Sequence, residues 1–417
     1  MTPEEAGPDW PHSLANDDRP LNGLRVLDLS RIVAGPLCAM LLADLGADVV
    51  KVEGPSGDEI RKWGPPFVEQ QAAYYYVPNK NKWLLTLDLK SPGGQLVLAE
   101  LIKAADVVIH NFTADVAQAL EVDFGRVAAI NPRIIYLTIS GFGPAQANRP
   151  GFDLVAQATS GLMSVTGNPE TGPTKVGVPI SDIASAHYGA IGVLAIVAQR
   201  GIGAIRSGKQ FPAVQLDVAL QDASISLLAN QAANWLLGGI NGTLRGNDHP
   251  SVAPYSVFAT GDGAIALAVG TSKQFERLCQ VLGCGELTAD PRFSDNASRL
   301  RHRNELRKLL ETALARESAA KWHELLSAHG VPNGPILDVS DAIEDPACDL
   351  VGNIGDTGGR PLRLMATPVR IDGSYYPPYI APGLPDADAA EILACMGLAK
   401  ELAAPTPPTG EPGTSGE

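Results

Sequence analysis

Residues 24–53 read LRVLDLSRIVAGPLCAMLLADLGADVVKVE and carry a complete strand, helix and strand pattern. The apolar run at 24–29 is typical of a buried strand. Pro36 suits the first turn of a helix that Gly46 ends, and DVVKVE at 48–53 indicates a second strand. Two strands joined by a helix in this way run parallel. The stretch therefore predicts an α/β fold built on a parallel sheet.

The same alternation continues along the next part of the chain. Further strands are expected at 83–87, 107–110 and 134–140, with helices at 94–104 and 114–120 between them. This pattern predicts an open Rossmann-like sheet, in which ligands bind beyond the carboxyl ends of the strands. The loops at those ends are residues 30–35, 110–112 and 141–143. None of these loops carries the GxGxxG phosphate-binding pattern, so a nicotinamide-dependent activity is not favoured.

The pattern changes in the second half of the chain. Residues 256–269 predict a hairpin, and residues 271–330 are largely helical and charged, which together indicate a small α+β domain. The Pro- and Gly-rich segment 331–336 is typical of a linker. The chain is expected to start with a disordered segment at 1–20, followed by the first part of a large domain at 21–225 and the small domain at 226–330. A linker and a return to the large domain are expected at 331–403, and a disordered tail at 404–417.

Composition and charge exclude several classes of function. The 417 residues carry a formal net charge of -14, which argues against nucleic acid as a partner because phosphate binding needs a basic surface. The chain starts with polar and acidic residues rather than a signal peptide, and no apolar run approaches the ~20 residues of a membrane helix. The five cysteines include no CxxC pair, which is typical of a reducing cytosol and gives no metal site. A cytoplasmic protein without a membrane partner is expected.

The segment VGVPISDIASAHYG at 176–189 places one carboxylate, Asp182, before an apolar helix expected at 183–199. Asp is a common N-cap, so the local pattern alone favours a structural role for Asp182. A carboxylate at a helix start can also attack an acyl group, with backbone N–H groups nearby to bind the developing oxyanion. His187 is expected to pack within this helix, whereas His110 at a strand end either packs or contacts a ligand.

Three lysines form a separate basic cluster. Lys80, Lys82 and Lys90 lie around Trp83, at an expected strand start. Their charges suit either phosphate contacts or a solvated edge of the sheet, and the charge pattern favours the solvated edge.

Ten short segments make the chain as a whole resemble the class III CoA-transferases, the formyl-CoA and carnitine CoA-transferase family. They follow one another between about residues 21 and 396 and read LNGLRVLDLSRIVAGP, LGADVVKVEGPSGD, NKNKWLLTLDLK, HNF, GFGP, RPGFDLVAQATSGLMSVTG, VGVPISDIASA, SGKQ, HPSVAPYSVFATGDG and GVPNGPILDV. Each segment is weak alone, but ten in this order are specific. RKWGPPF and the HPSVAPY loop make the chain most similar to members that use succinyl-CoA and a dicarboxylate.

The resemblance assigns roles to individual residues. Asp182, in ISDIASA, matches the aspartate that family members acylate. The residues that match CoA contacts are Ile32, Val33, Ala34, Leu87, Lys90, Asn111 and Phe112. Gly54 stands where some members have a CoA-binding arginine, and Thr113 starts a segment where they have a Pro-Gly turn with a downstream arginine. Arg61 and Arg149 are therefore the candidates for the remaining phosphate contacts.

The implied activity is transfer of CoA from an acyl-CoA to a carboxylic acid through an aspartyl anhydride and an aspartyl-CoA thioester. This chemistry needs no metal and no tightly bound cofactor, because the CoA thioester is itself the substrate. Family members are interlocked homodimers, so the same assembly is expected here. The segment GNDHPSVAPY at 246–255 stands where some members have a glycine-rich lid, but it holds one glycine, so lid behaviour is not favoured.

Two other functions remain open on the sequence. An α-methylacyl-CoA racemase shares the fold, but Phe152 replaces the histidine of its Gly-His-Asp sequence and cannot exchange a proton. A non-catalytic regulator that binds CoA is the second alternative, and the retention of Asp182 in its full setting argues against it.

Overall fold

The computed structural model describes residues 10–11, 18–207, 211–357 and 360–398. The chain divides into two compact units. The first comprises residues 1–162, 176–238 and 349–417, and the second comprises residues 163–175 and 239–348. The second unit therefore has limits that differ from the 226–330 expected for a small domain, and it includes an earlier segment. The tail expected at 404–417 lies outside the described residues.

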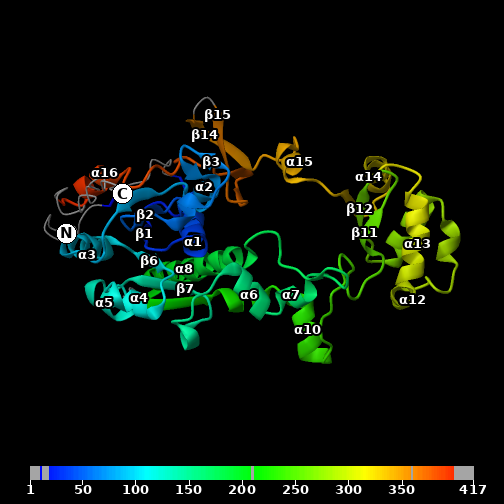
Figure 1. The fold of residues 1–417 in the computed structure, drawn as a ribbon, viewed down its shortest axis with the longest axis horizontal. Coiled ribbons are helices and arrows are strands. Elements are labelled where there is room, and N and C mark those ends of the chain that lie inside the picture. Colours follow the sequence, from blue (N-terminus) through cyan, green and yellow to red (C-terminus); the bar gives the residue numbers. More distant parts are fainter. Residues whose placement is uncertain (1–9, 12–17, 208–210, 358–359, 399–417) are drawn as a thin grey trace, which may run out of the picture. The chain divides into compact units, whose positions relative to one another are not determined.

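The first unit is built on a six-stranded sheet in the order β10-β7-β6-β1-β2-β5, with every neighbouring pair parallel (Figure 1). The strands are β1 (Arg25–Asp28), β2 (Asp48–Glu53), β5 (Trp83–Thr86), β6 (Val107–His110), β7 (Ile135–Ser140) and β10 (Val214–Ala219). The expected α/β fold with an open parallel sheet is confirmed. The chain order reverses between β1 and β6. Open α/β sheets bind ligands beyond the carboxyl ends of the strands at such a reversal.

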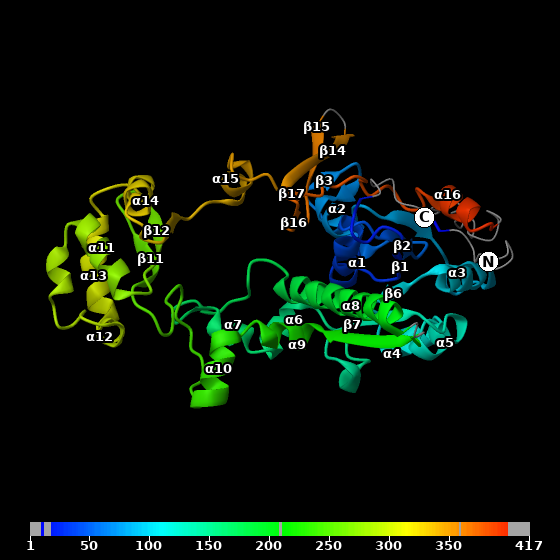
Figure 2. The same cartoon turned by 180° about the vertical axis from the view of Figure 1, so that it is seen from behind.

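Helices cover both faces of this sheet because successive side chains along each strand point to opposite sides. Val26 and Leu137 face the core shared with α1 and α8, whereas the adjacent Leu27 and Tyr136 face the other core. The covering helices are α1 (Ala34–Asp44) and α8 (Ile180–Ser207) on the first face, and α3 (Pro92–Ala104), α4 (Ala114–Ala119), α5 (Phe124–Ile130) and α16 (Ala389–Cys395) on the second. Figure 2 shows α8 running alongside α1.

The long helix α8 is more apolar than the sequence suggested. Residues Ile180–Gly201 are long and apolar enough to cross a membrane by length and composition alone, although no such segment was expected. Core helices pass the same test, and one face of α8 packs on α1, β7 and β10. We therefore treat α8 as the core helix that carries Asp182.

Smaller elements complete the first unit. They are the 3-10 helix η2 (Glu59–Lys62), the hairpin β3 (Phe67–Val68) and β4 (Gln71–Ala72), α2 (Ala73–Asn79), α6 (Asp153–Thr159), α9 (Leu220–Ser226), α10 (Ala229–Gly238), and the pairs β14 (Val351–Thr357) with β15 (Arg360–Met365) and β16 (Arg370–Ile371) with β17 (Ser374–Tyr375). Helices α9 and α10 are separate, because Ala229 at the start of α10 has φ +41° and interrupts a continuous helix.

Part of the segment expected to be disordered at 1–20 is packed. The Trp10 side chain is buried, and its indole N–H donates to the carbonyl oxygen of Asp48 at 3.0 Å. The Arg19 guanidinium donates to the Asp44 carbonyl oxygen at 2.8 Å and lies over the Tyr379 ring at 4.5 Å. The remaining residues of this segment, apart from Pro11, Asp18 and Pro20, lie outside the described part of the chain.

The second unit has its own core. Its antiparallel sheet has the order β11-β12-β13, and its apolar residues include Phe258, Ile265, Phe275 and Leu310. Its elements are β8 (Gly167–Asn168), β9 (Gly172–Pro173), β11 (Tyr255–Ala259), β12 (Ala264–Ala268), α11 (Ser272–Leu282), η4 (Gly285–Thr288), α12 (Asn296–Arg301), α13 (Arg303–Leu314), α14 (Ala319–Ala328), β13 (Asn333–Pro335) and α15 (Val339–Glu344). The short α7 (Leu162–Val165) and the residue pair 238–239 span its boundaries with the first unit.

Candidate active site

Asp182 lies in the first turn of α8, which begins at Ile180, and is not the N-cap that the sequence predicted. Asp153, the first residue of α6, holds the start of the helix instead, because its Oδ1 accepts the Ser181 N–H at 2.9 Å. The other oxygen of Asp153 accepts from Gln157 Nε2 at 2.8 Å. Asp153 therefore does the work expected of Asp182, and the Asp182 carboxylate is left available for other contacts.

The surroundings of Asp182 disfavour its charged form. Its pKa is raised to about 7, first because burial removes water from the carboxylate and second because the Asp153 carboxylate lies nearby. Among the described residues, no ion pair or hydrogen bond to the Asp182 side chain is formed. A partly buried carboxylate without a cation is a candidate functional group, since structural carboxylates at such depth are normally paired.

Tyr74 lies close enough to feel the same two charges. Its pKa is raised to about 12 by burial, then by Asp182 and Asp153, so its hydroxyl stays protonated at neutral pH and can donate a hydrogen bond. Tyr74 and Ile32 pack on one small cluster of Val33, Ile60 and Tyr75, which links the tyrosine to the loop after β1. The sequence analysis missed Tyr74, since three consecutive tyrosines give no signal of which one faces the site.

The loop after β1 and the segment after β6 meet as the sequence predicted for the carboxyl edge. Asn111 Nδ2 donates to the Arg31 carbonyl oxygen at 2.7 Å, and the Arg31 N–H donates to Asn111 Oδ1 at 2.9 Å. The Arg31 guanidinium lies 5.4 Å from the centre of the Phe112 ring. Val33 and Ala34, where α1 begins, are buried beside them. The structure thus brings together five of the expected CoA contacts, namely Ile32, Val33, Ala34, Asn111 and Phe112.

The other expected CoA contacts have different environments. Leu87 is fully buried, and its N–H donates to the Glu53 carbonyl oxygen at 2.9 Å, so it extends β5 rather than offering a surface. Lys90 is exposed. Arg149 is also exposed, with its guanidinium 3.6 Å from the Phe142 ring centre and 2.9 Å from Gln146 Oε1. The side chains of Lys90 and Arg149 are therefore accessible to an anion, whereas Leu87 is enclosed in the core.

Arg61 does not suit the phosphate contact expected of it. All five of its N–H donors are engaged within the protein. Two bind Glu53 at 2.8 and 3.0 Å, one binds Tyr75 Oη at 2.5 Å, and two bind Gln71 and the Gly383 carbonyl oxygen. The side chain is buried. We correct the expectation accordingly, because a phosphate would have to displace a buried ion pair.

The lysines around Trp83 do not form the solvated edge of the sheet that the charge pattern favoured. Lys80 and Lys82 are buried, not solvated, and pair with Asp44 and Asp28. Only Lys90 of the three is exposed. The two buried lysines therefore belong to the scaffold.

The two histidines considered from the sequence, His110 and His187, bind partners other than Asp182. His110 is buried, which lowers its pKa to about 4, and its Nε2 lies 3.0 Å from Thr138 Oγ1. It lines a pocket of about 170 Å³ together with Phe112 and Tyr136. His187 is exposed rather than packed as expected, with its Nδ1 2.6 Å from the Ile183 carbonyl oxygen. The described residues contain no cluster of three or more His, Cys, Asp or Glu side chains that could hold a metal.

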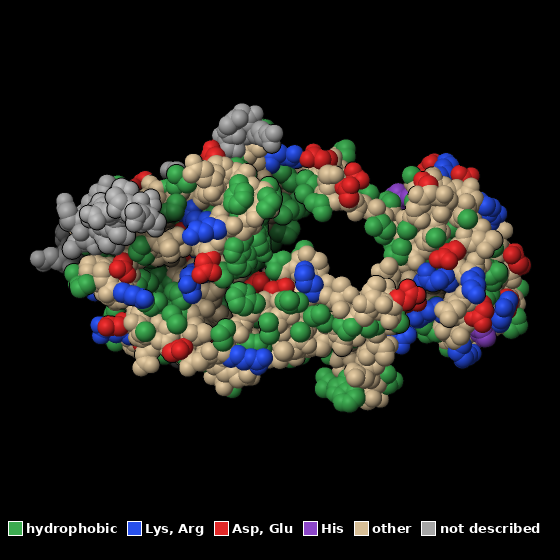
Figure 3. Space-filling view, in the orientation of Figure 1, with side chains coloured by type: hydrophobic (Ala, Val, Ile, Leu, Met, Phe, Trp, Pro, Cys, Tyr) green, Lys and Arg blue, Asp and Glu red, His purple; other side chains and the backbone are tan. Residues whose placement is uncertain are grey.

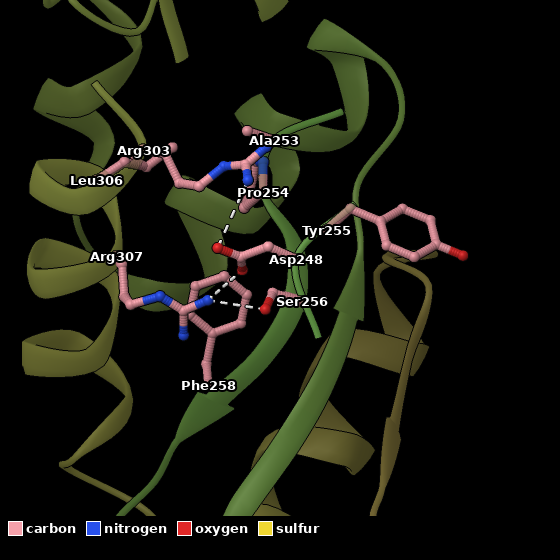
Figure 4. Close-up of a pocket in the computed structure, with 9 residues that line it drawn as sticks. All are labelled: Asp248, Ala253, Pro254, Tyr255, Ser256, Phe258, Arg303, Leu306 and Arg307. Carbon is pink, nitrogen blue, oxygen red and sulfur yellow. Dashed lines mark hydrogen bonds and ion pairs between the residues drawn. The ribbon is translucent and has the colours of Figure 1, made fainter. Parts of the chain in front are cut away.

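The segment 246–255 belongs to the second unit and is tied to α13 (Figure 4). Asp248 accepts from Arg307 at 2.5 Å, and Arg307 also donates to Ser256 Oγ at 2.7 Å. Arg303 donates to the His249 carbonyl oxygen at 2.7 Å. These bonds anchor the segment, which agrees with its low glycine content.

Comparison with known proteins identifies the class to which this fold and site belong. Residues 21–387 match the model of CoA-transferase family III. The succinate–glutarate CoA-transferase of Agrobacterium fabrum is 40% identical over 347 residues, covering 80% of this chain and 84% of that protein. The succinyl-CoA:glutarate CoA-transferase of Homo sapiens is 36% identical over 340 residues, covering 81% and 76%. A crystal structure of a CaiB/BaiF family protein from Brucella suis is 37% identical, with a TM-score of 0.79 and coverage of 90% and 99%.

The fold and the matches together define a transferase. The chain belongs to CoA-transferase family III, and it is an enzyme that transfers CoA between an acyl-CoA and an acid.

Proposed function

We propose that Asp182 is the nucleophile of this CoA-transferase and carries both the acyl group and CoA in turn. The observation that supports the proposal is the partly buried Asp182 carboxylate, which has no cationic partner among the described residues and a pKa raised to about 7. About half of such groups are ionised at neutral pH, and an ionised carboxylate with little hydration is a good nucleophile.

The reaction proceeds by two exchanges that each keep the acyl bond activated. The Asp182 carboxylate attacks the thioester carbonyl of the donor, the C–S bond breaks, and a mixed anhydride and CoA thiolate form. The thiolate then attacks the aspartyl carbonyl, the donor acid leaves, and CoA is held on Asp182 as a thioester. The acceptor carboxylate attacks this thioester and releases the thiolate, which attacks the acceptor acyl carbon and restores the Asp182 carboxylate.

Groups near Asp182 are suited to stabilise the oxyanions that form in these steps. The first turn of α8 contributes the positive end of the helix dipole, while its Ser181 and Ile183 N–H groups already donate to Asp153 Oδ1 and the Pro179 carbonyl oxygen. Tyr74, which stays protonated, offers a hydroxyl. Removal of one such donor in other enzymes costs about 10²-fold or more in rate. Exclusion of water by the surrounding apolar residues protects the anhydride and the thioester from hydrolysis.

The substrates we propose are succinyl-CoA as the donor and a dicarboxylate as the acceptor. The relatives named for succinate and glutarate support this class. CoA would lie along Ile32, Val33 and Ala34 and the Asn111–Phe112 segment, with its phosphates toward exposed cations. Those cations are Arg31, Lys90 and Arg149.

We also propose that two copies of the chain form the interlocked homodimer. Helix α10 supports this assembly, because Trp235, Leu236 and Leu237 expose 58%, 77% and 90% of their surfaces in a single chain. Figure 3 shows hydrophobic side chains gathered at this helix. Such a patch is typical of a surface that a partner covers. Sedimentation of the purified protein tests the assembly, and a monomer at micromolar concentration would contradict it.

An exchange assay tests the activity. The enzyme is incubated with succinyl-CoA and each member of a panel of dicarboxylates and monocarboxylates, and new acyl-CoA is measured by mass spectrometry. Formation of a dicarboxyl-CoA supports the proposal. Exchange of the α-proton of an acyl-CoA with deuterium, without transfer, would point to the racemase, and neither reaction would point to a regulator.

A further inference from the structure

The loop after β1 holds an uncommon backbone conformation. Ile32 has φ +69°, in the left-handed region. A β-branched residue rarely adopts this region, because its side chain crowds the backbone. Such a conformation persists only where surrounding contacts fix it, and it occurs most often at functional sites. The residues that fix Ile32 therefore matter for the geometry of the loop.

Two buried charged residues from other segments hold this loop. Both carboxylate oxygens of Asp58 lie 3.1 Å from the Ile32 backbone N, whose N–H donates to them. Lys51 Nζ, from the middle of β2, donates to Asp58 Oδ2 at 3.1 Å and to the Ser30 carbonyl oxygen at 2.9 Å. The side chains of Lys51 and Asp58 have no exposed surface. The strained residue and the segment just before it are thus held by the same ion pair.

A second ion pair supports the first. Lys82 Nζ donates to Asp28 Oδ2 at 2.8 Å and to the Pro36 carbonyl oxygen at 2.7 Å, in the first turn of α1. Asp28 Oδ1 accepts the Ser30 N–H at 3.0 Å. The two lysines and two carboxylates balance in charge, so the network is satisfied without a ligand. Its backbone contacts all fall between Ser30 and Pro36, apart from the Asp58 contact with the Ile60 N–H.

We propose that Asp58 and Lys51 are positioning residues that hold the Ile32–Ala34 loop in the shape that receives the CoA thioester. They touch no reacting atom and act only through the loop. This inference rests on the proposed function, since it is that function which places CoA on the loop.

A pair at the other end of α1 supplies a matched control. Lys80 and Asp44 are also buried, with 4% and 2% of their side-chain surfaces exposed, and they lie in the same unit as Lys51 and Asp58. Asp44 is the last residue of α1 and binds Asn81 Nδ2 at 2.7 Å and Thr367 Oγ1 at 2.7 Å. None of these contacts involves residues 30–36. Loss of either pair should destabilise the protein, but only loss of the Lys51–Asp58 pair should change CoA binding.

The test compares Asp58→Asn with Asp44→Asn in the full-length protein. We measure the melting temperature, the Kd for CoA by calorimetry and the KM and kcat with succinyl-CoA. Both variants should melt at lower temperature. Asp58→Asn should raise the Kd for CoA about tenfold and Asp44→Asn less than twofold. Equal effects of the two variants on CoA binding would overturn the inference.

A double-mutant cycle with Ile32→Gly separates positioning from general damage. Glycine adopts a positive φ without steric cost, so a loop with Ile32→Gly depends less on the Lys51–Asp58 ion pair. Asp58→Asn should then weaken CoA binding less than threefold in the Ile32→Gly background. Equal effects in both backgrounds would contradict the inference. If Asp58→Asn alone fails to fold, two double variants that each remove a whole ion pair are compared for CoA binding. One combines Lys51→Met with Asp58→Asn, and the other combines Lys80→Met with Asp44→Asn.

The calorimetric Kd needs no turnover, so it is independent of the chemistry at Asp182. A wild-type protein that binds CoA but transfers none would contradict the proposed function, but not the positioning role of Asp58 and Lys51. A protein that transfers CoA and binds it equally well after Asp58→Asn would contradict only that positioning role.

Discussion

Two regions of the first unit bury carboxylates in opposite ways. Asp28 and Asp58 each form an ion pair with a lysine. Burial alone would raise the pKa of Asp28, but the ammonium groups of Lys82 and Lys51 hold it below the ordinary value. Around Asp182, burial and then the like-charged Asp153 raise the pKa to about 7. Burial alone therefore does not distinguish the two kinds of carboxylate. They differ in whether a cationic partner is present among the described residues.

This difference follows from what each region must do. A buried ion pair loses several kcal/mol when one partner is removed, so paired acids lock a conformation and stay inert. A buried carboxylate without a cationic partner is destabilised, and acylation of its oxygen removes the charge. We therefore expect such a carboxylate to be more reactive.

Replacement of the unpaired acid should have the largest effect. Asp182→Ala should lower the transfer rate by about 10⁴-fold or more, because the covalent route is lost. Calorimetry should give a Kd for CoA within threefold of the wild-type value. Transfer at a normal rate by this variant would remove Asp182 from the mechanism.

Replacement of a paired acid should affect stability instead. Asp28→Asn should lower the free energy of unfolding by about 3–5 kcal/mol, because Lys82 is left buried without its partner. The lowered pKa of Asp28 means that this stabilisation is present above the pKa of the unfolded chain and is lost as the pH falls through the folded value. Urea unfolding at pH 7 and at pH values below the ordinary Asp value of 3.8 measures both effects. A variant as stable as the wild type at pH 7 would show that the pair is not stabilising.

The two acids should respond to pH with opposite signs. The pKa of Asp182 is raised by folding, so its ionisation costs stability that grows as the pH rises from about 4 to about 7. Asp182→Asn should therefore raise the melting temperature at pH 8 and have less effect at pH 4.5. Scanning calorimetry at the two values measures this, and a variant less stable than wild type at pH 8 would refute the contrast.

The rate should follow the same ionisation. With the carboxylate as nucleophile, kcat/KM should rise about tenfold per pH unit below pH 7 and level off above it. A profile that is flat between pH 5 and pH 8 would mean that a group with this pKa does not limit the reaction. The stability of succinyl-CoA at each pH is the control.

The smallest expected effect concerns the neighbour of Asp182. Asp153→Asn removes a like charge while its oxygen can still accept the Ser181 N–H. The midpoint of the pH–rate profile should move to lower pH by up to about one unit. The matched variant Asp123→Asn, which caps α5 away from Asp182, should leave the midpoint unchanged.

The sequence alone predicted the sheet well and the site in part. The strands came from short apolar runs such as 24–29 and 48–53, whose length and flanking turns are local features. The start of α8 near Asp182 is local too, but the residue that caps it, Asp153, lies 28 positions before Ser181 and no local rule finds it. Arg61 was predicted to be a free cation because its four partner residues come together only through tertiary packing.

One missed pair did leave a signal in the sequence. Lys51 lies inside the apolar run DVVKVE, and a lysine in a strand covered on both faces needs a buried partner. The identity of that partner, Asp58, could not be deduced, because several acids follow within a few residues.

The most direct test of the account is to trap the loaded enzyme. The wild-type protein is mixed with succinyl-CoA, quenched with hydroxylamine or borohydride, and digested for peptide mapping by mass spectrometry. If Asp182 is the nucleophile, a modification that depends on the acyl-CoA should be found at Asp182. An unmodified Asp182 in an enzyme that is turning over, or a modification at another residue, would contradict it.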